Sequence, residues 1–316
     1  CAAIAILGPN LGWQAAHGWP ILEVLGGDVT HRHAFQNGLL LESYDLLRNA
    51  PAFAVEQLVY TNPVAATVWI AGLAAPFRIE TLRDLRFVSI AFAAVFITAI
   101  ALDAKGYYIV GCYATLLAIG AIVVERAAVA VRAAILAVLV AVALVAMPLS
   151  LPILPVDTLI GYTRLLGLTG RNDRPAHLIQ PVFAEEFGWD RLARDVASAY
   201  FSLPAPIRSR TAIYADTYGD AGGLEFYGPR YGLPPPISSQ NNYYLWGTRG
   251  YDGSTLLAIG ATQIGRLRRL YRSVRLVRTS SEPYKWIVEG PAPIYLCREP
   301  VAPLPVIWPM LRWYGA

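Results

Sequence analysis

Lysine and cysteine are scarce in this chain of 316 residues, and each shortage argues against a class of function. The only lysines are Lys105 and Lys285, the remaining basic residues are spread along the chain, and the net charge is only +4. Nucleic-acid binding is therefore not expected. The three cysteines, at positions 1, 112 and 297, have neither a metal-ligand spacing nor an obvious disulfide framework. We expect them to be small core hydrophobes and predict no metal site.

Charge is scarce in the first half of the chain. Residues 1–156 carry 17 Asp, Glu, Lys and Arg side chains, whereas residues 157–316 carry 31. This contrast predicts an α-helical membrane domain over 1–156 and a soluble domain over 157–316. Within the membrane domain, four charge-free runs are each about as long as a bilayer-spanning helix, namely 61–77, 87–102, 106–124 and 133–151.

The first 60 residues precede these runs. The opening Cys-Ala-Ala-Ile-Ala-Ile-Leu has no basic region and no small-residue cleavage site, which argues against a signal peptide. We expect it to be the end of a truncated span, and the chain to be a fragment lacking an N-terminal part. Residues 9–26 are apolar with two tryptophans and predict a helix or re-entrant piece at the membrane interface. Residues 34–48 predict an amphipathic helix, which extends the interfacial region over 9–48.

The charges in the links between the runs predict the orientation of the membrane domain. The links 78–86 and 125–132 are rich in arginine, whereas the turn at 103–105 carries one Asp and one Lys. By the positive-inside rule the two arginine-rich links are cytoplasmic. The turn, the segment 8–60 and everything after residue 152 are then expected outside.

The soluble domain follows three prolines, at 148, 152 and 155, that end the last run. Its hydrophobic periodicity alternates between the helical and the strand type, which predicts a small α/β layer domain. The predicted helices cover 157–168, 182–202, 219–228 and 262–272, and the predicted strands cover 211–215, 255–260, 274–278 and 293–297.

Lys105, with Tyr107 and Tyr108, is the first candidate site. A lysine in a tight turn between two spans is costly unless it is solvated or paired, so it is a functional candidate by default. Its ammonium group can bind a phosphate as a compact point charge, with the tyrosine hydroxyls as further donors. The alternative is anchoring at the interface, where both lysine and tyrosine are common.

Asn10, Gln14 and His17 are the second candidate. On a helix these positions form one polar stripe on an otherwise apolar segment, and at membrane depth such a stripe faces the interior. The alternative is a re-entrant helix that satisfies its own polar groups. Glu23 and Asp28 follow on the same side, where either can pair with a cation or act as a base.

Two further segments, 218–232 and 239–247, are rich in glycine or in Tyr, Trp and Asn. A glycine-rich turn after a strand can cradle a phosphate, but neither a dinucleotide-binding nor a Walker spacing is present, so turn chemistry is the favoured interpretation. Tyr, Trp and Asn clusters are suited to sugars, and they also pack small domains.

Five segments follow one another along the chain: Pro-Asn-Leu-Gly-Trp-Gln-Ala-Ala-His-Gly-Trp-Pro-Ile-Leu-Glu at 9–23, Lys-Gly-Tyr-Tyr-(x4)-Tyr-(x6)-Gly-Ala at 105–121, Phe-Gly-Trp-Asp at 187–190, Tyr-Gly-Asp-Ala-Gly-Gly-Leu-Glu-Phe-Tyr-Gly-Pro-Arg-Tyr-Gly-Leu-Pro at 218–234 and Asn-Tyr-Tyr-Leu-Trp-Gly at 242–247. Together they resemble bacterial members of glycosyltransferase family 39, relatives of protein O-mannosyltransferases and of the lipid A aminoarabinose transferase. The chain departs from the family at Val182 and Gln240, where we expect histidine and assign no role.

The resemblance implies a GT-C type membrane enzyme that takes a sugar from a polyprenyl-phosphate donor on the outer face. Lys105 matches the family's lysine at the start of a span and suits the donor phosphate. His17 and its surroundings match the interfacial segment near the active site. The catalytic carboxylate is expected in a first external loop upstream of Cys1, so no catalytic residue is assigned and the fragment itself is expected to be inactive.

The sequence hypothesis is therefore a membrane glycosyltransferase in the bacterial inner (plasma) membrane, with its C-terminal domain periplasmic or extracellular. Its expected partners are membrane lipid, a polyprenyl-phosphate sugar as substrate, and a protein, lipid or glycan acceptor; no cofactor is assigned. Two alternatives stay open. One is a membrane transporter, although the paired repeats typical of transporters are not visible. The other is a membrane-anchored, non-enzymatic envelope protein that binds glycan.

Overall fold

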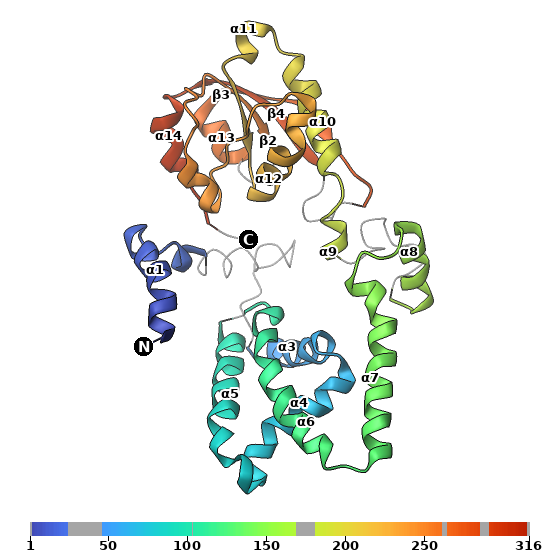
Figure 1. Ribbon diagram of the computed structural model, residues 1–316. Helices are drawn as coiled ribbons and strands as arrows, with labels where there is room; N and C mark the ends of the chain where they lie inside the picture. Colours follow the sequence, from blue (N-terminus) through green and yellow to red (C-terminus); the bar gives the residue numbers. More distant parts are fainter. Residues whose placement is uncertain are drawn as a thin grey trace. The chain divides into compact units, whose positions relative to one another are not determined.

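The computed structural model divides into two compact units, which are described separately (Figure 1). One unit comprises residues 36–154, and the other comprises residues 1–35 together with 155–316. The first 35 residues thus group with the C-terminal part of the chain, whereas the sequence hypothesis assigns them to the membrane domain. The described residues are 2–24, 46–102, 104–168, 181–260, 264–284 and 291–314.

The unit 36–154 is helical and apolar. Among the described residues, three helical segments are long and apolar enough to cross a membrane, and they overlap three of the predicted spans: Glu80–Ala101, Gly106–Glu125 and Val129–Ser150. The number rises to four if a bent pair, Ala50–Tyr60 with Pro63–Arg78, counts as one span. The helices are α3 (Leu46–Tyr60), α4 (Pro63–Arg78), η1 (Glu80–Leu85), α5 (Arg86–Ala101), η2 (Gly106–Cys112), α6 (Tyr113–Glu125) and α7 (Val129–Ser150).

The chain bends by 108° between α3 and α4, and the residues at the bend favour the start of a new helix. Pro63 occupies the first turn of α4, and Asn62 adopts a positive φ of 69° while its side chain accepts a hydrogen bond from the Val64 amide at 3.0 Å. The predicted amphipathic helix 34–48 lies mostly outside the described residues. The helix that is described, α3, runs on to Tyr60, which the sequence analysis did not predict.

Helices α4 and α6 pack so closely that their backbones are in contact. A Cβ atom added at Gly72 would overlap the Leu116 carbonyl oxygen, and one added at Gly120 would overlap that of Val68. Small residues permit this approach, which is a common way for helices to associate in a membrane. A core that includes Phe53, Trp69, Phe92 and Tyr113 surrounds the contact. By contrast, α7 has no buried residue within the described structure.

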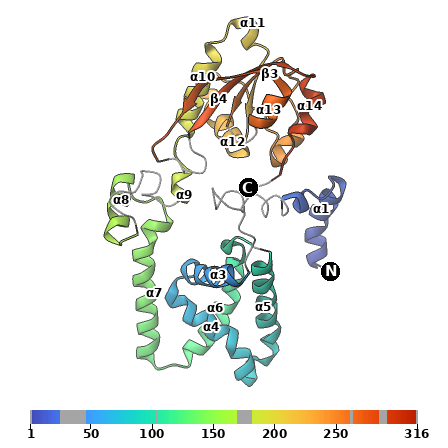
Figure 2. The ribbon, with the colours of Figure 1, turned by 180° about the vertical axis from the view of Figure 1, so that it is seen from behind.

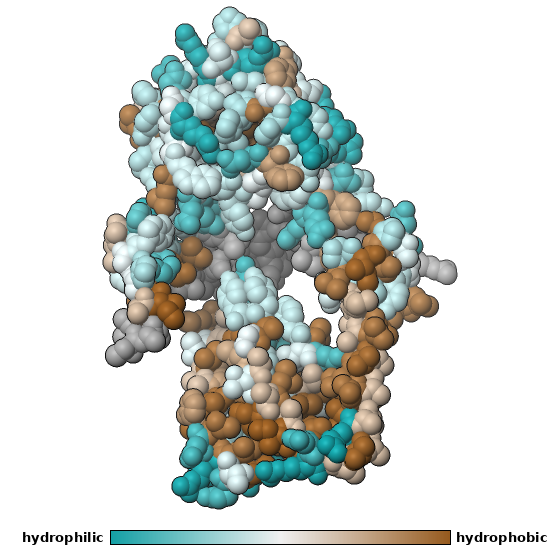
Figure 3. Space-filling view, viewed as in Figure 1, coloured by the Kyte–Doolittle hydropathy of each residue, from teal (hydrophilic) through white to brown (hydrophobic). Residues whose placement is uncertain are grey.

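On the face that Figure 3 shows, this unit is mostly brown, hence hydrophobic, along its helices, and hydrophilic residues gather at the end where α5 begins. Both ribbon views show the start of α7 at that same end (Figures 1 and 2). This distribution is the one expected for helices in contact with lipid chains.

The second unit contains a mixed four-stranded sheet with the strand order β1-β2-β4-β3. β1 and β2 are parallel, and β4 is antiparallel to both of its neighbours. The prediction of a small α/β domain is confirmed at this level, and each predicted strand overlaps a strand of the sheet. The strands are β1 (Thr211–Ala215), β2 (Thr255–Ile259), β3 (Tyr271–Ser280) and β4 (Ala292–Pro300).

Helices cover both faces of this sheet because successive strand residues point to opposite sides. Ile213 packs with residues of α10 (Trp189–Phe201) and α12 (Tyr218–Tyr227), whereas Tyr214 packs with residues of α13 (Ile264–Leu270) and α14 (Leu304–Leu311). The sequence analysis did not predict α14, which contains Pro305 and Pro309.

Shorter elements and the N-terminal helix complete this unit. Helix α1 ends at Ala16, and the chain breaks at residues 17–19 before becoming helical again at 20–24. Up to residue 24, where the described part ends, the predicted interfacial segment 9–26 thus consists of two helical pieces separated by a turn. The remaining elements are α1 (Ala2–Ala16), α8 (Val156–Leu165), α9 (Pro181–Ala184), α11 (Ala205–Arg208), η4 (Gly228–Tyr231) and η5 (Asn241–Trp246).

Candidate functional site

The predicted site residues divide between the two units. Lys105, Tyr107 and Tyr108 belong to the helical unit, whereas Asn10, Gln14 and His17 belong to the unit that contains the sheet. Each group is therefore a separate candidate site.

Lys105 stands immediately before η2, and Gln57 of α3 fixes the backbone beside it. The Gln57 side-chain amide is 1% exposed and donates to the Gly106 carbonyl at 3.2 Å, while its oxygen accepts from the Tyr113 hydroxyl at 3.2 Å. Because a buried amide is stable only when it is hydrogen-bonded, this side chain locks the turn against α3. The sequence analysis did not single out Gln57.

The Lys105 ammonium group is unpaired within the described part of the chain. Lys105 is partly buried and makes no hydrogen bond or ion pair with any other residue that the structure describes. A carboxylate is nearby, since a Cβ atom added at the neighbouring Gly106 would overlap the Glu56 side chain. A lysine ammonium has three N–H donors, and because no described residue accepts from them they suit a phosphate, water or a lipid headgroup.

Tyr107 and Tyr108 have more than half of their surface exposed, and their rings meet edge to face with centroids 5.0 Å apart. Their hydroxyls are thus accessible, which suits both a binding site for a donor phosphate and interfacial anchoring. The choice between these two interpretations stays open at this point.

The second candidate site is a cavity of about 650 Å³ in the unit that contains the sheet. Asn10 and Gln14 line it together with aromatic and amide side chains that come from distant parts of the sequence. His17 does not line it. Its ring stacks on Trp13 at 4.3 Å, and its Nδ1 lies 2.8 Å from the Trp13 carbonyl oxygen. The lining residues are Asn10, Trp13, Gln14, Pro20, Ile21, Val24, Tyr218, Asn241, Asn242, Tyr243, Trp246 and Tyr314.

Hydrogen bonds and one ion pair assemble the walls of this cavity. Gln14 accepts from the Ile21 amide at 3.1 Å, and Glu23 pairs with Arg312 at 2.5 Å, which ties the N-terminal segment to the C-terminal one. This pairing is one of the two roles predicted for Glu23, while Asp28 lies outside the described residues. Buried Gln240, for which no role was predicted, accepts from the Tyr218 amide at 2.6 Å. Val182 has no described side chain.

Side-chain contacts hold the aromatic wall of the cavity together. The rings of Tyr243 and Trp246 meet at 4.4 Å, the Tyr243 hydroxyl donates to Glu225 at 2.9 Å, and Arg249 lies over Trp246 while pairing with Glu225. Burial and the hydrogen bond to the Glu225 carboxylate raise the pKa of Tyr243 to about 12. Its hydroxyl therefore stays protonated at physiological pH and remains a hydrogen-bond donor.

The glycine-rich segment 218–232 has a structural role. Residues 218–227 form helix α12, and a Cβ atom added at Gly223 would overlap the Trp189 ring. The glycine therefore makes room for packing against α10, which is evidence against a phosphate-binding loop.

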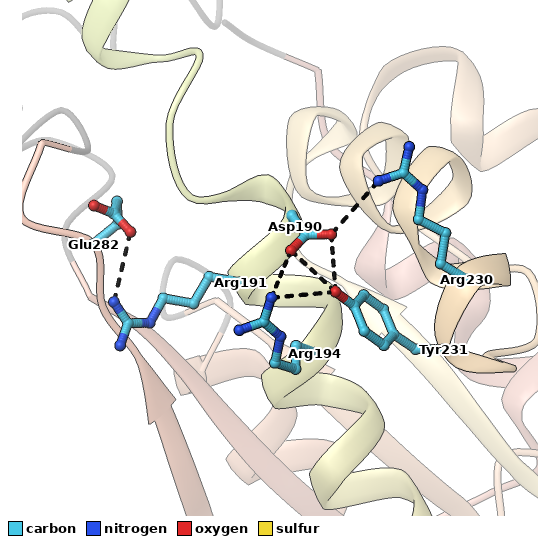
Figure 4. A network of polar contacts seen from close by, with 6 residues as sticks. All are labelled: Asp190, Arg191, Arg194, Arg230, Tyr231 and Glu282. Atoms are coloured by element: carbon cyan, nitrogen blue, oxygen red, sulfur yellow. Dashed lines mark hydrogen bonds and ion pairs between the residues drawn. The ribbon is translucent and has the colours of Figure 1, made fainter. Parts of the chain in front are cut away.

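The segments 187–190 and 228–231 meet in one polar cluster on the surface (Figure 4). The Tyr231 hydroxyl donates to both carboxylate oxygens of Asp190, at 2.9 and 3.0 Å, and Arg194 pairs with Asp190 at 2.9 Å. Arg230 lies 3.9 Å from the same carboxylate. The cluster fixes α10 against η4, so the polar residues of these two segments have a structural role.

Neither a metal site nor a relative emerges from the described chain. Among its described residues, no group of three or more His, Cys, Asp or Glu is placed to hold a metal ion. Comparisons with protein-family models, with curated proteins and with solved structures give no match to this sequence. The function must therefore be argued from the two sites alone.

Proposed function

We propose that this chain is part of a membrane glycosyltransferase of the GT-C type that takes a sugar from a polyprenyl-phosphate donor on the outer face of the membrane. In this proposal the helical unit lies in a bacterial plasma membrane and the α/β unit lies outside it. The acceptor is a protein, a lipid or a glycan.

The observation that carries the proposal is Lys105. It places an ammonium group without a described partner at the start of a segment, Gly106–Glu125, that is long and apolar enough to span a bilayer. A lipid phosphate lies at the depth where such a segment emerges. A cation there can bind the donor phosphate and stabilise the charge that develops as this phosphate departs. No described residue is assigned as the general base.

The test is binding of polyprenyl phosphate to the chain in lipid nanodiscs. A hydrogen bond to a charged group contributes about 1.5–3 kcal/mol, so Lys105→Ala should weaken binding by roughly 10- to 100-fold. Lys105→Arg, which keeps the charge, should recover part of the affinity. The matched control is Arg83→Ala, which removes an exposed cation from η1 and should leave binding unchanged. Equal binding by wild type and Lys105→Ala would contradict the donor role.

The glycan-binding alternative gains support from the cavity, which is lined by aromatic and amide side chains. It differs from the transferase in one measurable respect, because a protein that only binds glycan has no need of polyprenyl phosphate. No comparable observation favours the transporter.

A further inference from the structure

The cavity beside α1 differs in chemistry from the surroundings of Lys105. None of its twelve lining residues is charged. Among the described residues, the charged side chains that contact the lining are already paired, Glu23 with Arg312 at 2.5 Å and Glu225 with Arg249 at 3.1 Å. A phosphate or a nucleotide entering the cavity would lose hydration without meeting a free counter-charge from this part of the chain, which is unfavourable. The ligand that fits is therefore neutral.

The cavity combines flat apolar surfaces with groups that both donate and accept hydrogen bonds. Trp246 and Tyr218 have 56% and 48% of their surface exposed, so both offer accessible ring area. Asn10 and Asn242 are exposed and make no hydrogen bond to other described residues, and each amide has two donors and one acceptor oxygen. A sugar ring has the complementary pattern, an apolar face of C–H groups surrounded by hydroxyls.

We propose that this cavity binds a neutral saccharide, with one sugar ring stacked on Trp246 and its hydroxyls hydrogen-bonded to Asn10 and Asn242. The volume of about 650 Å³ suits this ligand, because small-molecule sites usually occupy about 300–1,000 Å³. The contact of Trp246 with Tyr243 restrains the ring, which lowers the entropic cost of binding. The role of this saccharide as the glycan acceptor rests on the proposed function, whereas its binding does not.

The place of Tyr218 is consistent with a ligand site. It begins α12 directly after β1, at the carboxyl end of the parallel pair β1–β2. In α/β folds, ligands bind preferentially outside the carboxyl ends of parallel strands. Asn241 to Trp246 come from η5, and the amide of Asn241 donates to the Trp313 carbonyl at 3.0 Å, which fixes η5 against the C-terminal segment.

The experiment is a saturation-transfer NMR titration of the full chain in nanodiscs free of glycoside detergents, with mannotriose, cellotriose and maltotriose as probes. We expect saturable binding of at least one trisaccharide. Trp246→Ala should weaken it by about tenfold or more, since the stacking surface is lost. Asn242→Ala should weaken it by about three- to tenfold.

Two controls show whether the effect is specific. Phe226→Ala removes an exposed ring of α12 that does not line the cavity, so it should bind as wild type does. Trp246→Phe keeps a ring and should recover most of the affinity, which separates stacking from a loss of folding. Failure of all three trisaccharides to bind would overturn the proposal. Unchanged binding by Trp246→Ala, or binding only of a proline-rich peptide, would overturn it as well.

The two proposals can fail independently. Lys105→Ala should retain trisaccharide binding, and Trp246→Ala should retain polyprenyl-phosphate binding. If Lys105→Ala lost trisaccharide binding and Trp246→Ala lost polyprenyl-phosphate binding, the two sites would not be separate. Trisaccharide binding without any polyprenyl-phosphate binding would preserve the saccharide site and contradict the transferase.

Discussion

At the scale of single residues, polarity within an apolar stretch is the most useful signal in this sequence. It draws attention to Lys105, Asn10 and Gln14, and the last two do line a cavity. It does not distinguish Gln57, although that amide is buried and holds the turn beside Lys105. In the sequence, Gln57 stands next to Glu56 and resembles a solvated surface residue. Only the structure shows that it is buried against Gly106 and Tyr113.

Cys297 gives a prediction at this scale. It is fully buried in β4, and burial raises the pKa of its thiol from 9.0 to about 12. In a Cys1→Ser, Cys112→Ser background, a maleimide should leave the folded protein unlabelled from pH 7 to pH 9.5. The unfolded protein should label completely, because its thiol is accessible and ionises near pH 9.

The sign of the accompanying stability effect follows from the raised pKa. The folded state holds the thiol proton more tightly than the unfolded state does, so this contribution to stability is complete below pH 9. It is lost as the pH rises from there towards 12. Labelling of the folded protein that increases steadily between pH 7 and pH 9.5 would show that Cys297 is accessible.

At the scale of helices and strands, periodic patterns predict most of the elements. The strand at 211–215 is predicted with its observed bounds, because its run of apolar and β-branched residues is short and clearly delimited. Helices α14 and α3 were not predicted. The first contains prolines, and the second lies between a predicted interfacial segment and a predicted span. Packing between elements is not visible in such patterns, as the close contact of α4 with α6 shows.

Gly120→Leu tests that contact. The new side chain would overlap the Val68 carbonyl oxygen of α4, so the two helices must separate. Overpacking of this kind costs about 1–3 kcal/mol, and we expect a lower apparent Tm in a thermal-shift measurement in nanodiscs.

Gly111→Leu is the matched control, since a Cβ atom at Gly111 meets no atom within 4 Å. Its apparent Tm should stay close to that of wild type. Equal effects of the two substitutions would show that α4 and α6 do not pack through Gly120.

At the scale of the whole molecule, the unequal charge of the two halves predicts an apolar helical part and a mixed α/β part, and both are present. The three long apolar helices are compatible with membrane insertion. The orientation stays a prediction, and it depends on the arginine-rich links 78–86 and 125–132.

Two single cysteines test the orientation in a background without the native ones. Asp84→Cys lies in η1, where the native side chain is 96% exposed, and Phe226→Cys lies on α12, where the native residue is 70% exposed. A membrane-impermeant maleimide added to intact cells should label Phe226→Cys. Asp84→Cys should label only after permeabilisation, and labelling of both from the same side would contradict the topology.

The sequence by itself determines the division into an apolar and a polar half, most of the elements and the isolated position of Lys105, because local periodicity and charge decide these features. Only the tertiary structure decides which side chains meet. It brings Asn10 and Gln14 beside Tyr218, Trp246 and Tyr314, more than 200 residues away in the chain, and it directs His17 onto Trp13 instead. Contacts of this kind depend on how the elements pack, which no local pattern encodes.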